Sequence, residues 1–197
     1  MRFMLGVDEA GRGPLAGPVA VGVIAVPANF IITREFPGLA DSKQMSPIAR
    51  MKMFRLLRKR MRDGDIQWCV RSTSAERIDA WGLTRAVASA SARGVRHLAP
   101  EPDGISVYLD GLLTAPDEYD QQTIIGGDEA VPIIALASIA AKVVRDRLMT
   151  RLAKQFPEYG FEKHKGYGTK EHYKALKRYG LCTIHRRSFI HLDLMKK

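Results

Sequence analysis

The stretch FMLGVDEAGRGPLAGPVAVGVIAV, residues 3–26, contains the pattern that decides the fold class. Phe3–Val7 is a short apolar run that ends in the acidic pair Asp8-Glu9, and it predicts a buried strand. The valine-rich run Val19–Val26 predicts a second strand. Glycines and prolines fill the segment between the two runs and are typical of a turn-rich connection. The chain therefore opens with two predicted strands and a glycine-rich turn between them.

Periodicity in the rest of the chain adds three strands and three long helices. The further strands are predicted at Gln67–Arg71, Ile105–Leu109 and Thr123–Ile125. The helices are predicted at Ile48–Arg62, behind a Ser46-Pro47 cap, at Leu83–Leu98 and at Pro132–Leu152. Strands come first and strand–helix units follow, which predicts an α/β fold with a mixed sheet and helices packed on it.

Composition and charge narrow the class of protein. The 197 residues are 46% hydrophobic and 26% charged, which is ordinary for one globular domain, or one domain with a small appendage. Lys and Arg number 31 against 21 Asp and Glu, so the formal net charge is +10. Such an excess of positive charge indicates a polyanionic partner, either nucleic acid or a membrane surface. The alternative is an ordinary soluble protein that happens to be basic.

Cysteine usage and hydropathy exclude several other classes. Cys69 and Cys182 are far apart, so we expect neither a disulfide framework nor a zinc finger, and we expect a reducing, cytoplasmic location. The longest apolar stretch, Val131–Ala141, is well short of the ~20 residues that a membrane helix needs. The N-terminal apolar run is too short for a signal peptide. We therefore expect no membrane partner.

Carboxylates follow three of the predicted strands: Asp8-Glu9, Asp110 and Asp128. Acids at strand ends can converge on one rim of a sheet, where four carboxylates would repel one another. Oxygen ligands without Cys or His suit Mg²⁺ or Mn²⁺, and two such ions can support a phosphoryl displacement. A basic protein with such a cluster of carboxylates has the features expected of a nuclease. The alternative is structural, because Asp is also a common turn residue and spacing alone does not bring the three segments together.

The segment Gly11-Arg12-Gly13 differs from a dinucleotide-binding fingerprint, because the third glycine comes only at Gly17 and Pro14 interrupts the run. It offers backbone N–H groups beside an arginine, which a ligand can approach closely. A plain tight turn is the equal alternative.

Two further segments combine cations with flexible backbone. Residues 163–169, KHKGYGT, hold Tyr167, whose ring can stack on a base or sugar; a solvated loop is the alternative. Asp41-Ser42-Lys43 is either a phosphate site at a helix start or a turn. We expect residues 185–188, HRRS, to be a solvated face, and we expect solvent or hydrogen-bonding roles for the histidines at 164, 172 and 185.

Several segments in the same order resemble those of bacterial type 2 ribonuclease H, ribonuclease HII. They are DEAGRGPLAGP (8–18), DSK (41–43), LDG (109–111), GD (127–128), ASIAAKVVRD (137–146), FPEYGF (156–161), HKGYGT (164–169) and HRRSF (185–189). They run through nearly the whole chain, and the first and HKGYGT are specific.

This resemblance implies a ribonuclease-H-like mixed five-stranded sheet flanked by helices, with a catalytic core at residues 1–155 and a helical C-terminal extension at 156–197 that completes the substrate site. It implies a metal-dependent endonuclease with two Mg²⁺ or Mn²⁺ ions. Its expected substrates are the RNA strand of RNA/DNA hybrids and duplex DNA with single embedded ribonucleotides, cut on their 5′ side to leave 3′-hydroxyl and 5′-phosphate ends. We expect a monomer that removes ribonucleotides during DNA replication and repair.

Site residues follow from the same resemblance, position by position. The catalytic and metal-binding acids are Asp8, Glu9, Asp110 and Asp128. The expected substrate contacts are Gly11, Arg12 and Gly13 with the ribonucleotide and its phosphate, Tyr167 with the following sugar, and Lys43 with a phosphate.

The chain departs from the family pattern at two places. Leu112 stands where the family usually has Asn, and Gly126-Gly127 stand where it often has a lysine. Both departures concern positioning and rate rather than the reaction class. Asp146 is a competing acid, which we interpret as an ion-pair residue on a helix face.

Three rival functions stay open at the level of sequence. One is a nucleic-acid-binding module without catalysis, which charge alone supports. Another is a nucleotide-cofactor enzyme built on the glycine turn. The third is a related endonuclease or integrase-type enzyme of the same fold.

Overall fold

The computed structural model describes residues 2–40, 42 and 44–190. Five strands make one sheet: Phe3–Ala10 (β1), Val19–Pro27 (β2), Gln67–Thr73 (β3), Ile105–Asp110 (β4) and Asp120–Ile124 (β5). The longer helices are Pro47–Arg62 (α2), Ala75–Trp81 (α3), Leu83–Leu98 (α4), Pro132–Leu152 (α6) and Lys170–Tyr179 (α8). Short helical turns are Ile32–Glu35 (α1), Gly127–Ala130 (α5), Pro157–Tyr159 (η1), Phe161–His164 (α7) and Arg187–Phe189 (η2).

The sheet is mixed, as predicted, with the strand order β3-β2-β1-β4-β5. The first three strands form an antiparallel meander, and β4 and β5 add in parallel beside β1. The predicted helices Leu83–Leu98 and Pro132–Leu152 are confirmed at both ends. Strand β1 continues three residues beyond its predicted end, so Asp8 and Glu9 lie within it.

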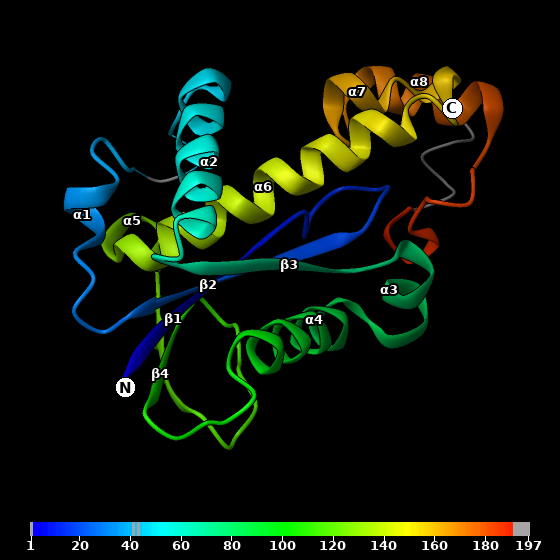
Figure 1. Cartoon of the computed structure of the whole chain (residues 1–197). Coiled ribbons are helices and arrows are strands. Elements are labelled where there is room, and N and C mark those ends of the chain that lie inside the picture. The colour runs from blue at the N-terminus through cyan, green and yellow to red at the C-terminus, as the bar shows by residue number, and fades with distance from the viewer. Residues whose placement is uncertain (1, 41, 43, 191–197) are drawn as a thin grey trace.

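Helices cover both faces of the sheet (Figure 1). Helix α6 crosses one face and α4 covers the other, and α2 packs against α6 on its side of the sheet. The contact of α6 with β1 and β2 is very close at two glycines. A Cβ on Gly6 would lie 2.5 Å from the Ile133 carbonyl oxygen, and one on Gly22 would lie 2.3 Å from that of Ala137. These glycines let the α6 backbone lie directly on the strands.

The C-terminal elements build a separate apolar cluster at the far end of α6. Tyr159, Phe161 and Leu176 pack there against Leu15 and Met149, which belong to the β1–β2 connection and to α6. The extension therefore shares its core with the segment that follows the acidic pair of β1. The division of the chain at residues 155 and 156 stays a prediction.

No helix in the described ranges is both long and apolar enough to cross a lipid bilayer. Cys69 and Cys182 are both free thiols.

Candidate active site

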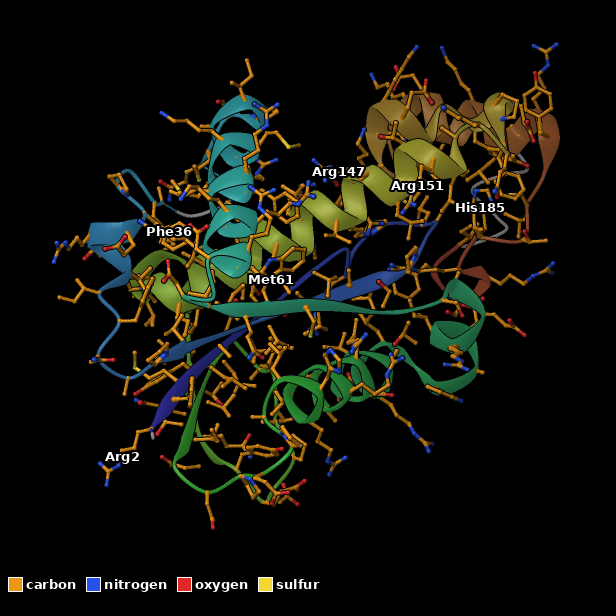
Figure 2. All side chains as sticks on the ribbon, viewed as in Figure 1. Arg2, Phe36, Met61, Arg147, Arg151 and His185 are labelled. Carbon is orange, nitrogen blue, oxygen red and sulfur yellow. The ribbon has the colours of Figure 1, made fainter. Side chains whose placement is uncertain are left out.

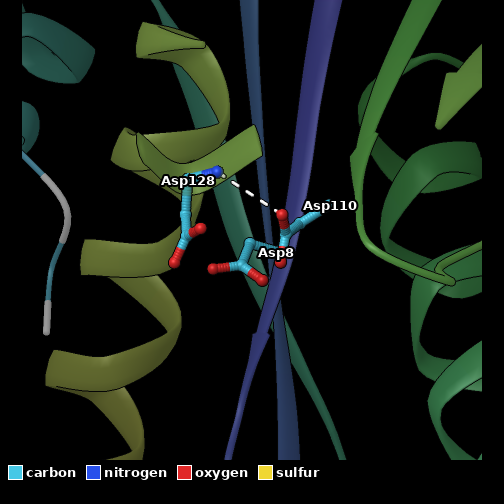
Figure 3. A group of neighbouring side chains, drawn as sticks. All are labelled: Asp8, Asp110 and Asp128. Atoms are coloured by element: carbon cyan, nitrogen blue, oxygen red, sulfur yellow. Dashed lines mark hydrogen bonds between the residues drawn. The ribbon is translucent and has the colours of Figure 1, made fainter. Parts of the chain in front are cut away.

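Three of the predicted acids come together beside the carboxyl ends of β1 and β4 (Figure 3). Asp8 lies near the end of β1, Asp110 is the last residue of the neighbouring β4, and Asp128 lies in α5. One carboxylate oxygen from each lies within 4.8 Å of the others. Asp8 and Asp128 are each only 3% exposed. The three segments, distant in the chain, therefore form one acidic pocket.

Parallel pairing of β1 with β4 sets two of these positions, because Val7 pairs with Leu109 and the acids follow directly. Asp110 Oδ1 then accepts hydrogen bonds from the Gly127 N–H at 2.7 Å and the Asp128 N–H at 3.4 Å, the second of which is dashed in Figure 3. Strand β5 ends at Ile124, so Asp128 lies in a helical turn and not directly after a strand as predicted. The Asp110 carboxylate thus holds the turn that presents Asp128.

Burial and like charge make this pocket costly to ionise. Burial, followed by repulsion from Glu9, raises the pKa of Asp8 to about 8. The hydrogen bond from the Ser138 hydroxyl opposes this rise, and repulsion from Asp110 adds a smaller contribution to it. Burial also raises the pKa of Glu9, which the neighbouring Arg12 guanidinium opposes. A divalent cation would remove this cost, and a set of carboxylate oxygens is the donor set that hard cations such as Mg²⁺ and Mn²⁺ prefer. The residues present therefore fit a divalent metal.

Glu9 lies beside the pocket and outside the group of three. Its Oε1 atom is 3.3 Å from Nη1 of Arg12, three residues further along the chain. The Arg12 side chain is 42% exposed, so this pair joins the acidic pocket to the surface of the glycine loop.

Two buried arginines hold the glycine loop, residues 11–18, by its carbonyl oxygens. Arg186 donates from Nε to Gly17 at 2.9 Å, from Nη1 to Arg12 at 2.7 Å and from Nη2 to Gly11 at 2.6 Å. Its side chain is fully buried, so the prediction of a solvated face at residues 185–188 is wrong for Arg186 and for His185, which is 3% exposed. The guanidinium is buried because its planar set of donors satisfies several loop carbonyls at once.

Arg145, on α6, holds the other side of the same loop. It donates to the carbonyl oxygens of Pro18, Ala16 and Lys165 at 2.9, 3.3 and 3.1 Å. Gly11, at φ +90°, has to be glycine here, because a Cβ would lie 2.0 Å from Arg145 Nε. The glycine of the predicted substrate loop is thus explained by close approach to a buried guanidinium.

Tyr167 lies beside the glycine loop. A Cβ on Gly13 would be 4.0 Å from the Tyr167 ring, and the Leu15 N–H donates to the Gly166 carbonyl oxygen at 2.8 Å. The ring is 42% exposed, and Lys142 Nζ lies 5.9 Å from its centroid. The structure therefore brings Gly13 and Tyr167 to one surface, with a cation next to the ring.

Two hydrogen-bonded neutral histidines, His172 and His185, support the backbone at Tyr167. His172 Nδ1 donates to the Tyr167 carbonyl oxygen at 2.9 Å, and His172 Nε2 lies 3.0 Å from His185 Nε2. His185 Nδ1 accepts the Cys182 N–H at 2.9 Å, so its Nε2 carries the proton that it donates to His172. Burial lowers the pKa of both rings to about 4, which keeps both histidines neutral at pH 7. The expected hydrogen-bonding roles of these histidines are confirmed.

Three further positions were named in the sequence analysis. Lys43 lies outside the described residues. Asp146 pairs with Lys142 at 3.0 Å, as interpreted from the sequence. Leu112 is 87% exposed.

Sequence reasoning missed the residues that hold the site rather than form it: Ser42, Ser138, Arg145 and Arg186. The Ser42 and Ser138 hydroxyl oxygens are 2.7 Å apart, and Ser138 also reaches Asp8. A lone serine in the apolar run of α6 was an available signal for Ser138. Nothing in the local sequence distinguishes the buried arginines from the many exposed ones.

We expect Asp8→Asn to stabilise the metal-free protein. The folded-state pKa of Asp8 is raised to about 8 from 3.8, so its ionisation opposes folding increasingly as the pH rises between these values. In chelator at pH 8, the variant should gain roughly 1–3 kcal/mol in the free energy of unfolding, measured by urea denaturation. Asp120→Asn, an exposed acid at the start of β5, is the control and should change little. A variant no more stable than the wild type would contradict the electrostatic account.

We expect the buried pair His172 and His185 to lower the free energy of unfolding in acid. Because the folded pKa of His172 and His185 is about 4, below the usual 6.5, stability is lost as the pH falls from 6.5 towards 4. His185→Gln keeps a donor towards His172 and does not titrate. Its loss of unfolding free energy between pH 7 and pH 4.5 should be smaller than that of the wild type by roughly 1–3 kcal/mol. Parallel pH profiles in urea denaturation would contradict this.

Comparison with known proteins agrees with the geometry. The sequence profile of the family described as Ribonuclease HII matches residues 5–192. The Ribonuclease HII of Endomicrobium trichonymphae is 45% identical over 186 residues, which cover 93% of this chain and 83% of that protein. The Ribonuclease HII of Chlamydia muridarum is also 45% identical, over 93% of this chain and 80% of its own.

A solved structure shares the whole architecture. The ribonuclease HII in the structure of the PCNA:RNase HII complex from Archaeoglobus fulgidus superposes with a TM-score of 0.77 at 25% identity, covering 98% of this chain and 97% of that one. The fold is thus the ribonuclease-H-like fold of that protein, and the matches extend through both the acidic pocket and the C-terminal elements. On these grounds the chain belongs to the ribonuclease HII family of nucleases, which hydrolyse the RNA of RNA/DNA hybrids.

Proposed function

We propose that this chain is a metal-dependent endonuclease that cuts the RNA strand of RNA/DNA hybrids and also cuts on the 5′ side of single ribonucleotides in duplex DNA. Its products carry 3′-hydroxyl and 5′-phosphate ends, and its role is the removal of ribonucleotides during DNA replication and repair. The observation on which this depends is the gathering of three carboxylates, from β1, β4 and α5, within 4.8 Å.

The metal site that we propose consists of Asp8, Asp110 and Asp128, with Glu9 beside them. The raised pKa of Asp8 supports this assignment, because the pocket is unfavourable for several negative charges without a cation. These four acids would hold two Mg²⁺ or Mn²⁺ ions, whose chemistry when bound would be to activate a water and to stabilise the departing 3′-oxygen. A protein of the same fold, Bst-RNase HIII, has been solved in complex with Mn²⁺.

The protein's own residues bind and orient the substrate in this proposal. The loop Gly11–Gly13 presents its outer face to the ribonucleotide while Arg186 holds two of its carbonyl oxygens from within. Arg12 contacts the neighbouring phosphate. Tyr167, half-exposed beside Gly13, stacks on the sugar that follows the ribonucleotide. Recognition of the 2′-hydroxyl then separates RNA from DNA at the cleavage point.

The remaining parts of the proposal concern partners and location. The net charge of +10 supports binding to a duplex. Two free thiols support a reducing, cytoplasmic compartment. We propose that the enzyme acts as a monomer, with residues 1–155 as its core and 156–197 as the extension that completes the substrate site.

We expect Asp110→Asn to abolish most cleavage. The amide retains the Oδ1 acceptor for the Gly127 and Asp128 N–H groups, so the α5 turn is kept while a charged ligand is lost. Turnover of a duplex with one ribonucleotide, in Mg²⁺ or Mn²⁺, should fall by about 100-fold or more. Asp120→Asn is again the control. Near-normal turnover of Asp110→Asn would overturn the assignment of the acids.

We expect Tyr167→Ala to impair junction cleavage far more than folding. Loss of the ring removes a stacking contact of about 1–3 kcal/mol, so cleavage at a single ribonucleotide should fall roughly 10-fold or more. Tyr167→Phe keeps the ring and should retain most activity. The measurement is the cleavage rate of an embedded ribonucleotide relative to a uniform hybrid, with thermal unfolding as the folding control. An unchanged ratio in Tyr167→Ala would count against the stacking role.

A further inference from the structure

A groove lies between α2 and α6, apart from the acidic pocket. Its volume is about 740 Å³, and its walls come from α2, α6, Trp68 of β3 and Lys165. The cations that line this α2–α6 groove are Arg50, Arg58, Arg147, Arg151 and Lys165. Figure 2 labels Arg147 and Arg151 on α6, in the part of the helix that runs on past α2.

The cations of the groove have no carboxylate partner in the part of the chain that the structure describes. Among residues 2–40, 42 and 44–190, no carboxylate forms an ion pair with any of these five cations. The one acid in the lining, Asp146, is already paired with Lys142. Two other cations of α2 are neutralised, because Lys59 pairs with Asp63, and Arg60 pairs with Glu35 and Asp65. What distinguishes the groove is that its five cations gather around one hollow from α2, α6 and Lys165.

The lining between these cations is apolar. Phe54, Trp68 and Val143 line the groove, and Arg147 lies with its guanidinium carbon 5.0 Å from the Phe54 ring centroid. A sugar-phosphate backbone presents apolar sugar faces together with regularly spaced charges. Guanidinium groups that have no ion pair with a described carboxylate, set over an apolar floor, match this chemistry better than they match a small anion or a metal ion.

The groove is connected to the acidic pocket through hydrogen-bonded side chains. Arg50 donates from Nε to the Ser42 carbonyl oxygen at 2.8 Å, the Ser42 hydroxyl lies 2.7 Å from that of Ser138, and Ser138 reaches Asp8. On its other side the groove includes Lys165, two residues before Tyr167. The groove thus lies close to residues of the proposed site, through Ser138 beside Asp8 and through Lys165 near Tyr167.

We propose that the α2–α6 groove binds the phosphate backbone of the substrate duplex outside the cleavage point, and so supplies affinity that does not depend on the ribonucleotide. This proposal rests on the proposed nuclease function. Phosphate contacts of this kind position a protein on a duplex and carry no sequence information. The groove should therefore hold an all-DNA duplex as well as a ribonucleotide-containing one.

The test is binding of an all-DNA duplex, without metal, at several salt concentrations. The groove variant is Arg58→Gln/Arg151→Gln, because both side chains are exposed and neither packs on the floor as Arg147 does. The control is Lys52→Gln/Arg85→Gln, which removes two exposed positive charges outside the groove. The groove variant should bind about 10-fold more weakly near 0.1 M salt, and the slope of log affinity against log salt should decrease by about 2 in magnitude. The control should stay close to the wild type.

Two further arms separate the possible outcomes. Arg58→Lys/Arg151→Lys keeps the charge and should restore the salt slope, which also shows that the effect is not misfolding. Equal affinity and slope for the groove variant and the control would overturn the proposal and leave the groove to an acidic protein partner. Cleavage of a ribonucleotide-containing duplex by the wild type is scored separately, so that failure of the nuclease function and failure of the groove are distinguishable.

Discussion

The arrangement of the site depends on two buried guanidinium groups that hold one loop by its carbonyl oxygens. Together Arg145 and Arg186 make five hydrogen bonds to loop residues 11–18 and one to Lys165. None of the ion pairs among the described residues includes either of them. Burial lowers the pKa of both, and repulsion from Arg145 adds to the effect at Arg186, whose pKa falls to about 9. Charge is therefore kept in the interior at a cost, and the loop gains a fixed conformation with positive charge behind it.

The acidic pocket and this loop form two oppositely charged halves of one surface. Asp8, Asp110 and Asp128 are crowded where β1, β4 and α5 meet, and the loop with its two arginines follows directly from β1. Each half is unfavourable alone, because like charges are held together out of water. Divalent cations would complement the acids, and a phosphodiester would complement the positive loop, as the proposed function requires. The folded protein without ligands is thus less stable than its packing alone would make it. Bound cations and phosphate would lower the electrostatic cost of holding like charges together.

Much of the fold follows from local pattern, and less of the site does. Apolar runs predict β1, β2 and β4, and alanine-rich periodicity predicts both ends of α4 and α6, because these elements are buried on regular faces. Strand β5 has no buried residue, and its prediction at Thr123–Ile125 overlaps only the end of the observed strand. Asp8 and Asp110 are visible because each lies at or near the end of a strand, and Asp128 was found although it lies in a helical turn four residues after β5 ends. Arg186 and His185 were expected in solvent, since nothing in HRRS shows that a distant loop will accept their hydrogen bonds. Such partners are separated by up to 175 residues and become apparent only in three dimensions. The position of Asp128 in a helical turn is similarly set by Asp110, not by its own neighbours.

The contact between Gly11 and Arg186 also sets an order of events during synthesis. The loop that follows β1 leaves the ribosome well before the guanidinium that fixes it, which is translated 175 residues after Gly11. Until then Gly11 and Arg12 lack the donors for their carbonyl oxygens, although β1, β2 and α6 can already pack. A nascent chain with a folded sheet would therefore still lack the fixed conformation of this loop. The loop would reach its final conformation only after Arg186 has been translated and has packed against it, so this part of the proposed site would be completed late in folding.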